Sequence, residues 1–432
     1  MKRFRFLALA LLVVAMWSWV AYADIFYNVV DSANTKYGII SGRDYNLQSG
    51  RRTNVKQYGL ALSFTDHKDK PWVIVDEHIS GSSAPDTIDI YDPYGNWSAP
   101  ASERTDWGSN LYDLAVADNF LYIVTFDRYE GETQASGQVI RVNLDNGFAP
   151  DGVVYKFEPN AQILRRPCAI EVIDGKLYVL TYTYDGEHSA DAGMGRSELF
   201  EFGRNLKLLR QTTIGGDDDL SARNAQFMTQ YGGKLYVGSS GGAQGSENSV
   251  GAVWEINPLT MDTKKIVDLK TVLTGSVWDG VNKGVSGISI AKDGTAYLLL
   301  GGYDANWSFT ARLYVVTVSN LINGSVGTLA PAPTGTGYAW DVVYDEDLET
   351  LWLTAGNQIE ARSKSGEIKK TFAPIDLGGD AYKIALIGGS TRYITAPTGD
   401  SSSGVEITVG VGKIVTDLKV IADVEKIEQK LR

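Results

Sequence analysis

The sequence predicts an all-β fold built from seven repeated units of short strands. In each unit a tight turn leads into a strand that begins with a three-residue motif, and the central residue of that motif is Tyr or Trp. Successive aromatic positions lie 41 to 61 residues apart, a spacing typical of radial or stacked β-arrays. The seven motifs are Pro71-Trp72-Val73, Leu121-Tyr122-Ile123, Leu177-Tyr178-Val179, Leu235-Tyr236-Val237, Ala296-Tyr297-Leu298, Leu351-Trp352-Leu353 and Arg392-Tyr393-Ile394.

The clearest unit contains four predicted strands. Small apolar residues alternate in Asp113–Ala117, and the turn Asp118-Asn119 leads into the heavier apolar strand Phe120–Phe126. Gln138–Leu144 alternates as a third strand and Val153–Phe157 is the fourth. Four antiparallel strands per unit make a β-propeller blade, so we predict a seven-bladed β-propeller of four-stranded antiparallel blades over residues 24–412.

The seventh unit has fewer strands than the others. It begins with Tyr382–Ile387, but hydrophobic residues in the following segment 413–432 recur every three or four positions, which predicts a short C-terminal helical, amphipathic tail. The beginning of this tail, Lys413–Val420, also fits an outer strand. We therefore expect an N-terminal strand, either Ile25–Val30 or Tyr37–Ser41, to close the ring and leave no unpaired edge.

Two segments of the sequence resemble a known superfamily. Ile290-Ala-Lys-Asp-Gly-Thr-Ala-Tyr297 and Ile173-Asp-Gly-Lys-Leu-Tyr-Val179 resemble the blades of bacterial propellers of the NHL and YVTN types. The resemblance covers nearly all of Tyr58 to Val411 and implies the fold. It does not imply one function, because these families include scaffolds, binders and enzymes. The sequence lacks WD dipeptides at strand ends and the tryptophan-docking repeats of quinone-dependent dehydrogenases.

Residues 1–23 have the features of a signal peptide. A basic start precedes the apolar run Leu7–Val20, and Ala21-Tyr22-Ala23 has the small-x-small form of a cleavage site. The apolar run is also near the minimum length for a retained anchor. We expect cleavage after Ala23, a periplasmic or secreted protein, and no membrane span in the mature chain.

Composition narrows the range of partners. The formal charge of −12 becomes −15 once the three basic residues of the signal are removed, and such a surface repels nucleic acid and anionic lipid. Cys168 is the single cysteine, so no internal disulfide forms, and its apolar setting predicts a small buried side chain.

The predicted working face carries the long loops. Connections between the second and third strands are long and polar, and in a propeller they emerge beside the links between blades and the channel entrance. Cationic and aromatic residues of these segments could hold a carboxylate or a sugar ring by bidentate contacts and stacking. They could instead satisfy blade backbones or pair with nearby Asp residues. The predicted ligand-binding set is Lys56, Trp107, Arg166, Arg223, Trp278, Lys283, Tyr338 and Tyr303, with Arg165 beside Arg166.

Metal and catalytic signals are weak. His78 and His188 lie in long loops and could meet near Asp185, so a divalent cation at these three residues is the alternative to our prediction of no cofactor. Asp217-Asp218-Asp219 lacks the alternating ligands and the glycine of an EF-hand loop. We assign no catalytic residue.

The sequence favours binding over catalysis. We predict an exported propeller that holds a small polar or anionic ligand, a glycan or an envelope protein on its long-loop face. One alternative is a propeller enzyme with its centre at the channel mouth, such as a lyase, a lactonase or a glycoside-cleaving enzyme. Another is an envelope scaffold without a small-molecule site.

Overall fold

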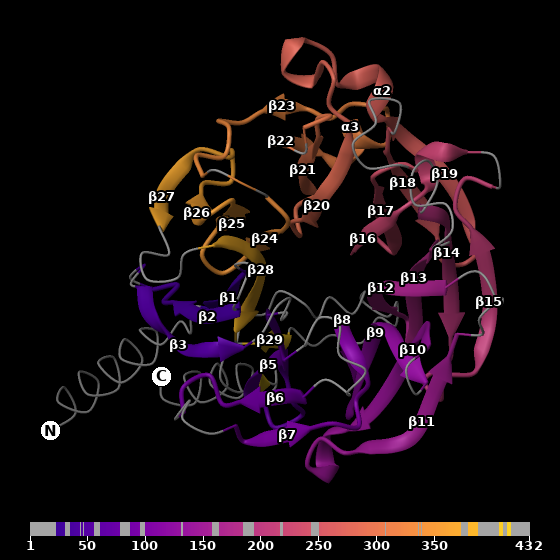
Figure 1. Cartoon of the computed structure of the whole chain (residues 1–432), viewed down its shortest axis with the longest axis vertical. Helices are drawn as coiled ribbons and strands as arrows, with labels where there is room; N and C mark the ends of the chain where they lie inside the picture. Colours follow the sequence, from indigo (N-terminus) through magenta and orange to yellow (C-terminus); the bar gives the residue numbers. More distant parts are fainter. Residues whose placement is uncertain are drawn as a thin grey trace, which may run out of the picture.

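Seven four-stranded antiparallel sheets are arranged in a ring around a central axis in the computed structural model of the chain (Figure 1). This confirms the predicted seven-bladed β-propeller. The structure describes residues 23–30, 35–43, 45, 47–55, 61–77, 87–95, 100–130, 133–157, 164–184, 194–216, 219–242, 250–306, 308–335, 337, 339–372, 379–387, 406–408 and 413–415.

Blades 1 to 6 are each built from four consecutive strands, and the first strand of each blade lies next to the axis. Blade 1 contains β4 (Ala61–Thr65), β5 (Pro71–Glu77), β6 (Thr87–Tyr91) and β7 (Ser102–Arg104). Blade 2 contains β8 (Ser109–Ala117), β9 (Phe120–Glu130), β10 (Thr133–Asn143) and β11 (Pro150–Lys156). Blade 3 contains β12 (Leu164–Ile173), β13 (Lys176–Tyr184), β14 (Met194–Phe202) and β15 (Leu208–Thr213).

The remaining three of these blades follow the same plan. Blade 4 contains β16 (Ala225–Tyr231), β17 (Lys234–Ser239), β18 (Ala252–Asn257) and β19 (Asp262–Asp268). Blade 5 contains β20 (Gly284–Ile290), β21 (Thr295–Tyr303), β22 (Phe309–Thr317) and β23 (Thr328–Leu329). Blade 6 contains β24 (Val342–Asp345), β25 (Thr350–Ala355), β26 (Gln358–Arg362) and β27 (Ile368–Phe372).

Blade 7 joins the two ends of the propeller. Its inner strand β28 (Asp380–Ile387) is followed in the sheet by β1 (Asp24–Val30), β2 (Thr35–Ile40) and β3 (Leu47–Val55). The predicted N-terminal closure is confirmed, and three N-terminal strands take part in it where one was expected. β1 occupies the place beside β28 that the sequence suggested for residues 392–395, which lie outside the described residues.

The other elements are short. β29 (Glu406–Thr408) and β30 (Lys413–Val415) form a two-stranded sheet of their own, so the tail begins with a strand, and residues 416–432 lie outside the described part. The helical elements are η1 (Leu144–Asn146), η2 (Leu220–Ala222), α2 (Leu269–Val272), η3 (Ser276–Trp278) and α3 (Val318–Leu321). Within the described ranges, no helix has the length and apolarity needed to cross a bilayer.

The repeated aromatic residues lie between neighbouring blades. Five of them are 3% exposed or less, namely Tyr122, Tyr178, Tyr236, Tyr297 and Trp352, whereas Trp72 is half-buried and Tyr393 lies outside the described residues. Three phenols donate to carbonyls in the turn between the third and fourth strands of the next blade: Tyr122 to Arg204 (2.8 Å), Tyr178 to Pro258 (3.4 Å) and Tyr297 to Lys364 (3.1 Å). These three rings therefore act as the wedges that the sequence predicted.

At five of the seven blade boundaries, a polar side chain connects one blade to the inner strand of the next. An inner strand is the edge of its sheet, so its outward N–H groups have no partner in the ladder. Side chains of the preceding blade accept these hydrogen bonds: Asp76 from Leu111 (2.8 Å), Asp113 from Ile170 (3.0 Å), Ser197 from Ala225 (3.0 Å), Ser289 from Tyr344 (3.1 Å) and Asp341 from Ile384 (3.1 Å). These bonds hold the inner strands at the blade boundaries and away from the axis.

Removing β1 and β2 tests the closure. A chain that starts at Ser41 leaves the β28 edge without its partner, and we expect it to lose the cooperative thermal transition of the ring. The control is a chain that starts at Asp24, and circular dichroism during heating compares the two. Similar melting of both chains would contradict closure by the N-terminus.

Candidate functional site

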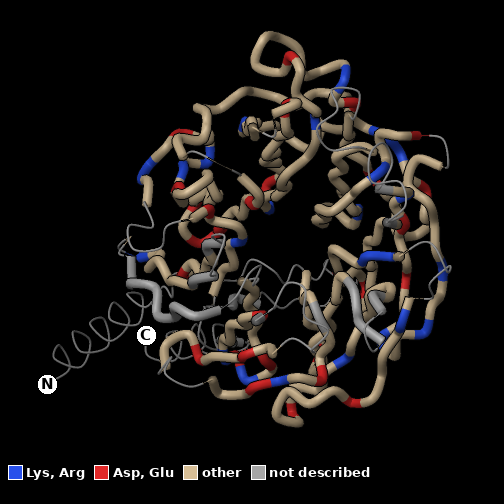
Figure 2. The backbone as a smooth tube through the Cα atoms, in the orientation of Figure 1, with Lys and Arg blue, Asp and Glu red and all other residues tan. Residues whose placement is uncertain are grey.

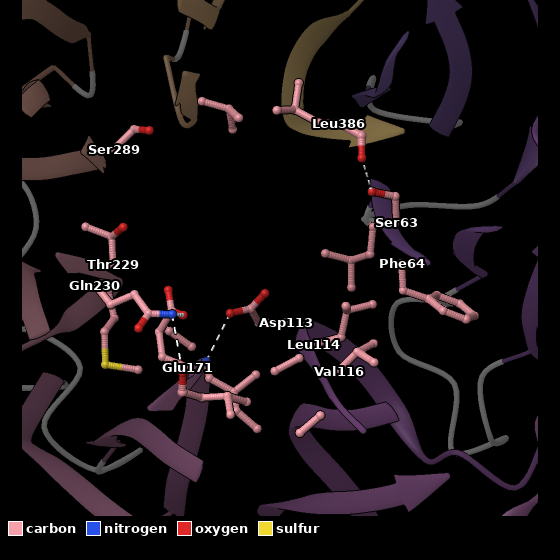
Figure 3. Close-up of a pocket in the computed structure, with 18 of the residues that line it drawn as sticks. Ser63, Phe64, Asp113, Leu114, Val116, Glu171, Thr229, Gln230, Ser289 and Leu386 are labelled. Carbon is pink, nitrogen blue, oxygen red and sulfur yellow. Dashed lines mark hydrogen bonds between the residues drawn. The ribbon is translucent and has the colours of Figure 1, made fainter. Parts of the chain in front are cut away.

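A cavity of about 840 Å³ runs along the axis of the ring. All seven inner strands contribute to its wall, and Figure 3 shows their side chains around the open centre. Its volume falls within the range of small-molecule sites, roughly 300–1,000 Å³. The cavity is therefore the candidate functional site.

A recurring β-bulge shapes one end of this cavity. Four inner strands skip one residue in their pairing with the second strand, and that residue lies four or five positions before the last residue of its strand: Tyr112, Cys168, Gln226 and Ser286. In β28 the pairing with β1 is also irregular, around Tyr382 and Lys383. A bulge bends its strand and redirects a side chain, so this level is where the blades can present polar groups.

Tyr112 connects blades across this end of the channel. Its hydroxyl donates to the Gln226 side-chain oxygen at 3.1 Å, and its ring stacks on Phe126 with centroids 4.9 Å apart. The Arg166 guanidinium covers Phe126 at 4.6 Å, and Tyr182 contacts the edge of the same ring. Burial, with contributions from Tyr382, Tyr182 and Cys168, raises the pKa of Tyr112 well above its usual value. The phenol therefore stays protonated.

Lys383 extends into the same region from blade 7. Its Nζ lies 6.0 Å from the ring centre of Tyr112 and 5.8 Å from that of Phe227, while its backbone N–H donates to Asn28 at 2.7 Å. Within the described residues, its ammonium has no hydrogen-bond acceptor and no ion pair. Asp113, Phe227 and Lys383 each lie four positions before the last residue of their inner strands, and Asp341 directly precedes β24. All four border the cavity, so we assign them to one level of the channel.

Cys168 lies beside these charges. Burial raises the pKa of its thiol well above the usual value, Asp113 raises it further and Lys383 opposes the increase. Its sulfur lies 3.2 Å from the carbonyl oxygen of Ala225. The thiol is thus buried as expected, and it is protonated, which makes it a poor nucleophile.

Polar groups continue along the wall toward the tight turns. Glu171, Thr229, Gln230 and Ser289 surround the opening, and the Asp113 carboxylate is directed into it (Figure 3). The Gln230 amide donates to Glu171 at 3.3 Å. Apolar side chains fill the spaces between them, including Leu114, Val116 and Leu386. The wall can therefore both donate and accept hydrogen bonds over an apolar background.

The rim at the tight-turn end is acidic. The turns that border the cavity contribute Asp66, Asp69, Asp118, Asp174 and Glu346, together with His67 and Arg204. Arg204 pairs with Asp118, and the His67 ring contacts Asp145 at 2.8 Å, so both basic side chains of the rim have acidic partners. Lysine and arginine are otherwise spread around the ring among acidic residues (Figure 2). The rim therefore favours neutral or weakly anionic molecules over polyanions.

Most described members of the predicted ligand-binding set are engaged in packing. Trp107, Trp278 and Tyr303 are buried, and the Trp107 indole donates to Phe148 at 3.2 Å. Lys283 donates to the carbonyl of Leu273 at 2.8 Å. Arg165 pairs with Glu198, Arg166 covers Phe126 as described above, and Arg223 is half-buried. None of these residues borders the cavity.

The other predicted residues lie outside the described part of the chain. They are Lys56, Tyr338, His78, His188 and Asp185. Among the residues that the structure does describe, no group of three or more His, Cys, Asp or Glu is placed to hold a metal ion. Asp304, directly after β21, accepts hydrogen bonds from the backbone N–H groups of Asn306 and Ser308, each at 2.8 Å, so its carboxylate stabilises a local turn.

The polar residues that border the channel at the level of the bulges were not identified from the sequence. The available signal was a charge within a strand of otherwise apolar residues next to a crowded axis, as at Asp113 and Lys383. The bulges that redirect Tyr112 and Gln226 have no residue signature of their own.

The fold resembles solved propellers at low sequence identity. No protein-family model matches the chain, and no curated protein matches it in sequence. A candidate 6-phosphogluconolactonase from Bacteroides fragilis NCTC 9343 matches with a TM-score of 0.55 and 12% identity, over 85% of this chain and 99% of that chain. Another from Bacteroides uniformis ATCC 8492 matches with a TM-score of 0.54 and 14% identity, over 84% and 99%. At this identity the likeness shows the fold alone.

Asp345 is a buried acid at the end of an inner strand. Its Oδ1 accepts hydrogen bonds from the backbone N–H of Asp347 (2.9 Å) and Leu348 (3.2 Å), whereas its Oδ2 has no partner in the described structure. Burial raises the pKa of this carboxyl from 3.8 to about 6 against the two backbone bonds, with smaller increases from Asp347 and Glu346. The folded state therefore binds this proton more tightly than the unfolded chain does.

This shift predicts a pH-dependent stability. The contribution of Asp345 is fully present below pH 3.8, where the carboxyl is protonated in both states, and is lost as the pH rises through about 6. The Asp345→Asn variant keeps the oxygen that accepts the turn bonds and removes the titration. We expect its free energy of unfolding to gain on the order of 2–3 kcal/mol relative to wild type between about pH 4 and about pH 7. Urea unfolding measures this, and a constant difference would contradict it.

Proposed function

We propose that this protein is an exported binding protein that holds a small polar ligand in its axial channel. The observation that carries the proposal is the cavity of about 840 Å³, to which all seven inner strands contribute and which presents polar groups from bulged positions. The proposal keeps the binding role inferred from the sequence and moves the ligand from the long-loop face into the channel. The reason is that the described candidates from the long-loop face are used in packing.

Export is supported by the position of the first strand. Cleavage after Ala23 would leave β1 whole, because β1 begins at Asp24. The Asp24 carboxylate accepts a hydrogen bond from the backbone N–H of Gly42 at 3.0 Å, so the new terminus would be attached to blade 7. The mature chain would then reach the periplasm or the medium with its ring intact.

The chemistry of the cavity favours binding over catalysis. The thiol in its wall is protonated, and the phenol of Tyr112 is held in its neutral form. Asp341 uses both of its oxygens to accept backbone N–H groups, at 3.0 and 3.1 Å, which is a structural role. These groups can hold a ligand by hydrogen bonds, and none of them is prepared as a nucleophile.

Filling the channel tests the binding site. Thr229→Trp places a large ring in the cavity wall of blade 4, and we expect it to remove most of the compound that copurifies with the wild-type protein. Thr328→Trp is the matched control, because Thr328 is exposed on the outer strand of blade 5. Mass spectrometry of the material released by denaturation measures the bound compound. An equal amount in both variants, or none in wild type, would contradict the proposal.

Lactone hydrolysis separates the binding proposal from the enzymatic alternative. The printed names of the similar structures make 6-phosphogluconolactone the appropriate probe. We expect no rate above that of buffer, because the acidic rim repels a phosphorylated substrate. A pH-stat assay measures the rate of hydrolysis. A rate above that of buffer that decreases in the Glu171→Gln variant, while the melting temperature of the variant equals that of wild type, would favour the enzymatic alternative.

A further inference from the structure

Lys383 is the cation at the bulged level of the channel. The two other basic side chains that border the cavity lie at the rim, where Arg204 and His67 contact Asp118 and Asp145. Lys383 instead lies among the bulged residues, and the described structure gives its ammonium neither an acceptor nor an ion pair. An ammonium has three donors, and leaving them without acceptors in a partly desolvated site is costly.

The neighbouring carboxylates are already used by the backbone. Asp341 accepts from Val342 and Ile384, and Asp113 accepts from Ile170. They therefore fix the boundaries between blades. The rings of Tyr112 and Phe227, about 6 Å from the ammonium, lie at the outer limit of cation–π contact and do not neutralise the charge.

We propose that Lys383 binds the carboxylate of a hydroxylated monocarboxylic acid, the ligand class of the channel. This inference rests on the proposed function and specifies its ligand. The carboxylate would contact the ammonium near the Tyr112 phenol and the Gln226 amide. The hydroxyl groups would extend toward Glu171, Thr229 and Ser289, which can accept or donate hydrogen bonds.

The charges around Lys383 favour a ligand that carries a single negative charge. Asp113 and Asp341 share its level, and Glu171 lies between that level and the rim. One ammonium can compensate one carboxylate, but a dianionic phosphate would also experience repulsion from the acidic groups. The rim adds to this discrimination.

Paired probes test the role of the charge. Glucuronate and glucose form one pair and glycerate and glycerol a smaller one, so that each acid has an uncharged counterpart. Calorimetric titration of the mature chain should show at least one acid binding more tightly than its counterpart by about tenfold or more, as expected for a charge-assisted hydrogen bond. Lys383→Met should abolish this preference and leave the affinity for the uncharged compound unchanged. Lys264→Met, an exposed lysine on β19, should bind as wild type.

The outcomes separate the ligand class from the binding function. Equal affinity for acid and uncharged compound, or a preference that survives in Lys383→Met, would overturn the role of Lys383. Tighter binding of inorganic phosphate or glucose 6-phosphate than of either acid would overturn the carboxylate. Failure of both acids to bind would also overturn this inference, while the copurified compound and the Thr229→Trp variant decide the proposed function independently.

Discussion

The contacts between each blade and the inner strand of the next determine the rest of the structure. An inner strand has one edge without a ladder partner, and each buried N–H left unsatisfied there would cost about 1–3 kcal/mol. Side chains such as Ser197 and Asp341 accept these bonds, and the wedged aromatic rings fill the space behind them. Because the inner strands are held at the blade boundaries, they do not collapse onto the axis. The open channel is thus a consequence of how the blades are joined.

The bulges separate two tasks along each inner strand. Toward the tight turn, regular pairing with the second strand maintains the blade. At the bulge, one residue leaves the ladder and its side chain becomes available for other contacts. Asp113, the first residue after the bulge in β8, combines both tasks, since one oxygen accepts from Ile170 of the next blade while the carboxylate faces the channel. The ring is therefore stabilised by some of the same side chains that give the channel its charge.

The sequence predicted the blades because a wedge between blades requires a large ring at a fixed register, which a repeated Tyr or Trp reveals. It also predicted the closure, since the seventh unit lacked strands. It missed the contribution of β3 because Leu47–Val55 is polar and contains no aromatic residue. The polar residues of the channel were missed for a different reason. A β-bulge depends on how two strands pair, and the sequence of one strand does not determine that pairing. The indole of Trp107 resembled a binding residue in the sequence, and in the fold it donates to Phe148.

The position of Lys383 gives the proposed site a selectivity that a cation at the surface could not provide. The chain is strongly acidic and the rim of the cavity carries several carboxylates, so the approach of any anion is opposed at long range and this opposition is screened by salt. At the level of the bulges, where the Lys383 side chain is half-buried, the attraction of one ammonium is screened less than at the rim. A monoanion faces a small barrier at the rim and finds a matching charge inside, whereas each additional negative charge increases the barrier without finding a second cation among the described residues of that level. In the proposed site, depth and rim charge together would select ligands by their charge number, and the hydroxyl and amide groups of the wall would select them by their hydrogen-bonding pattern.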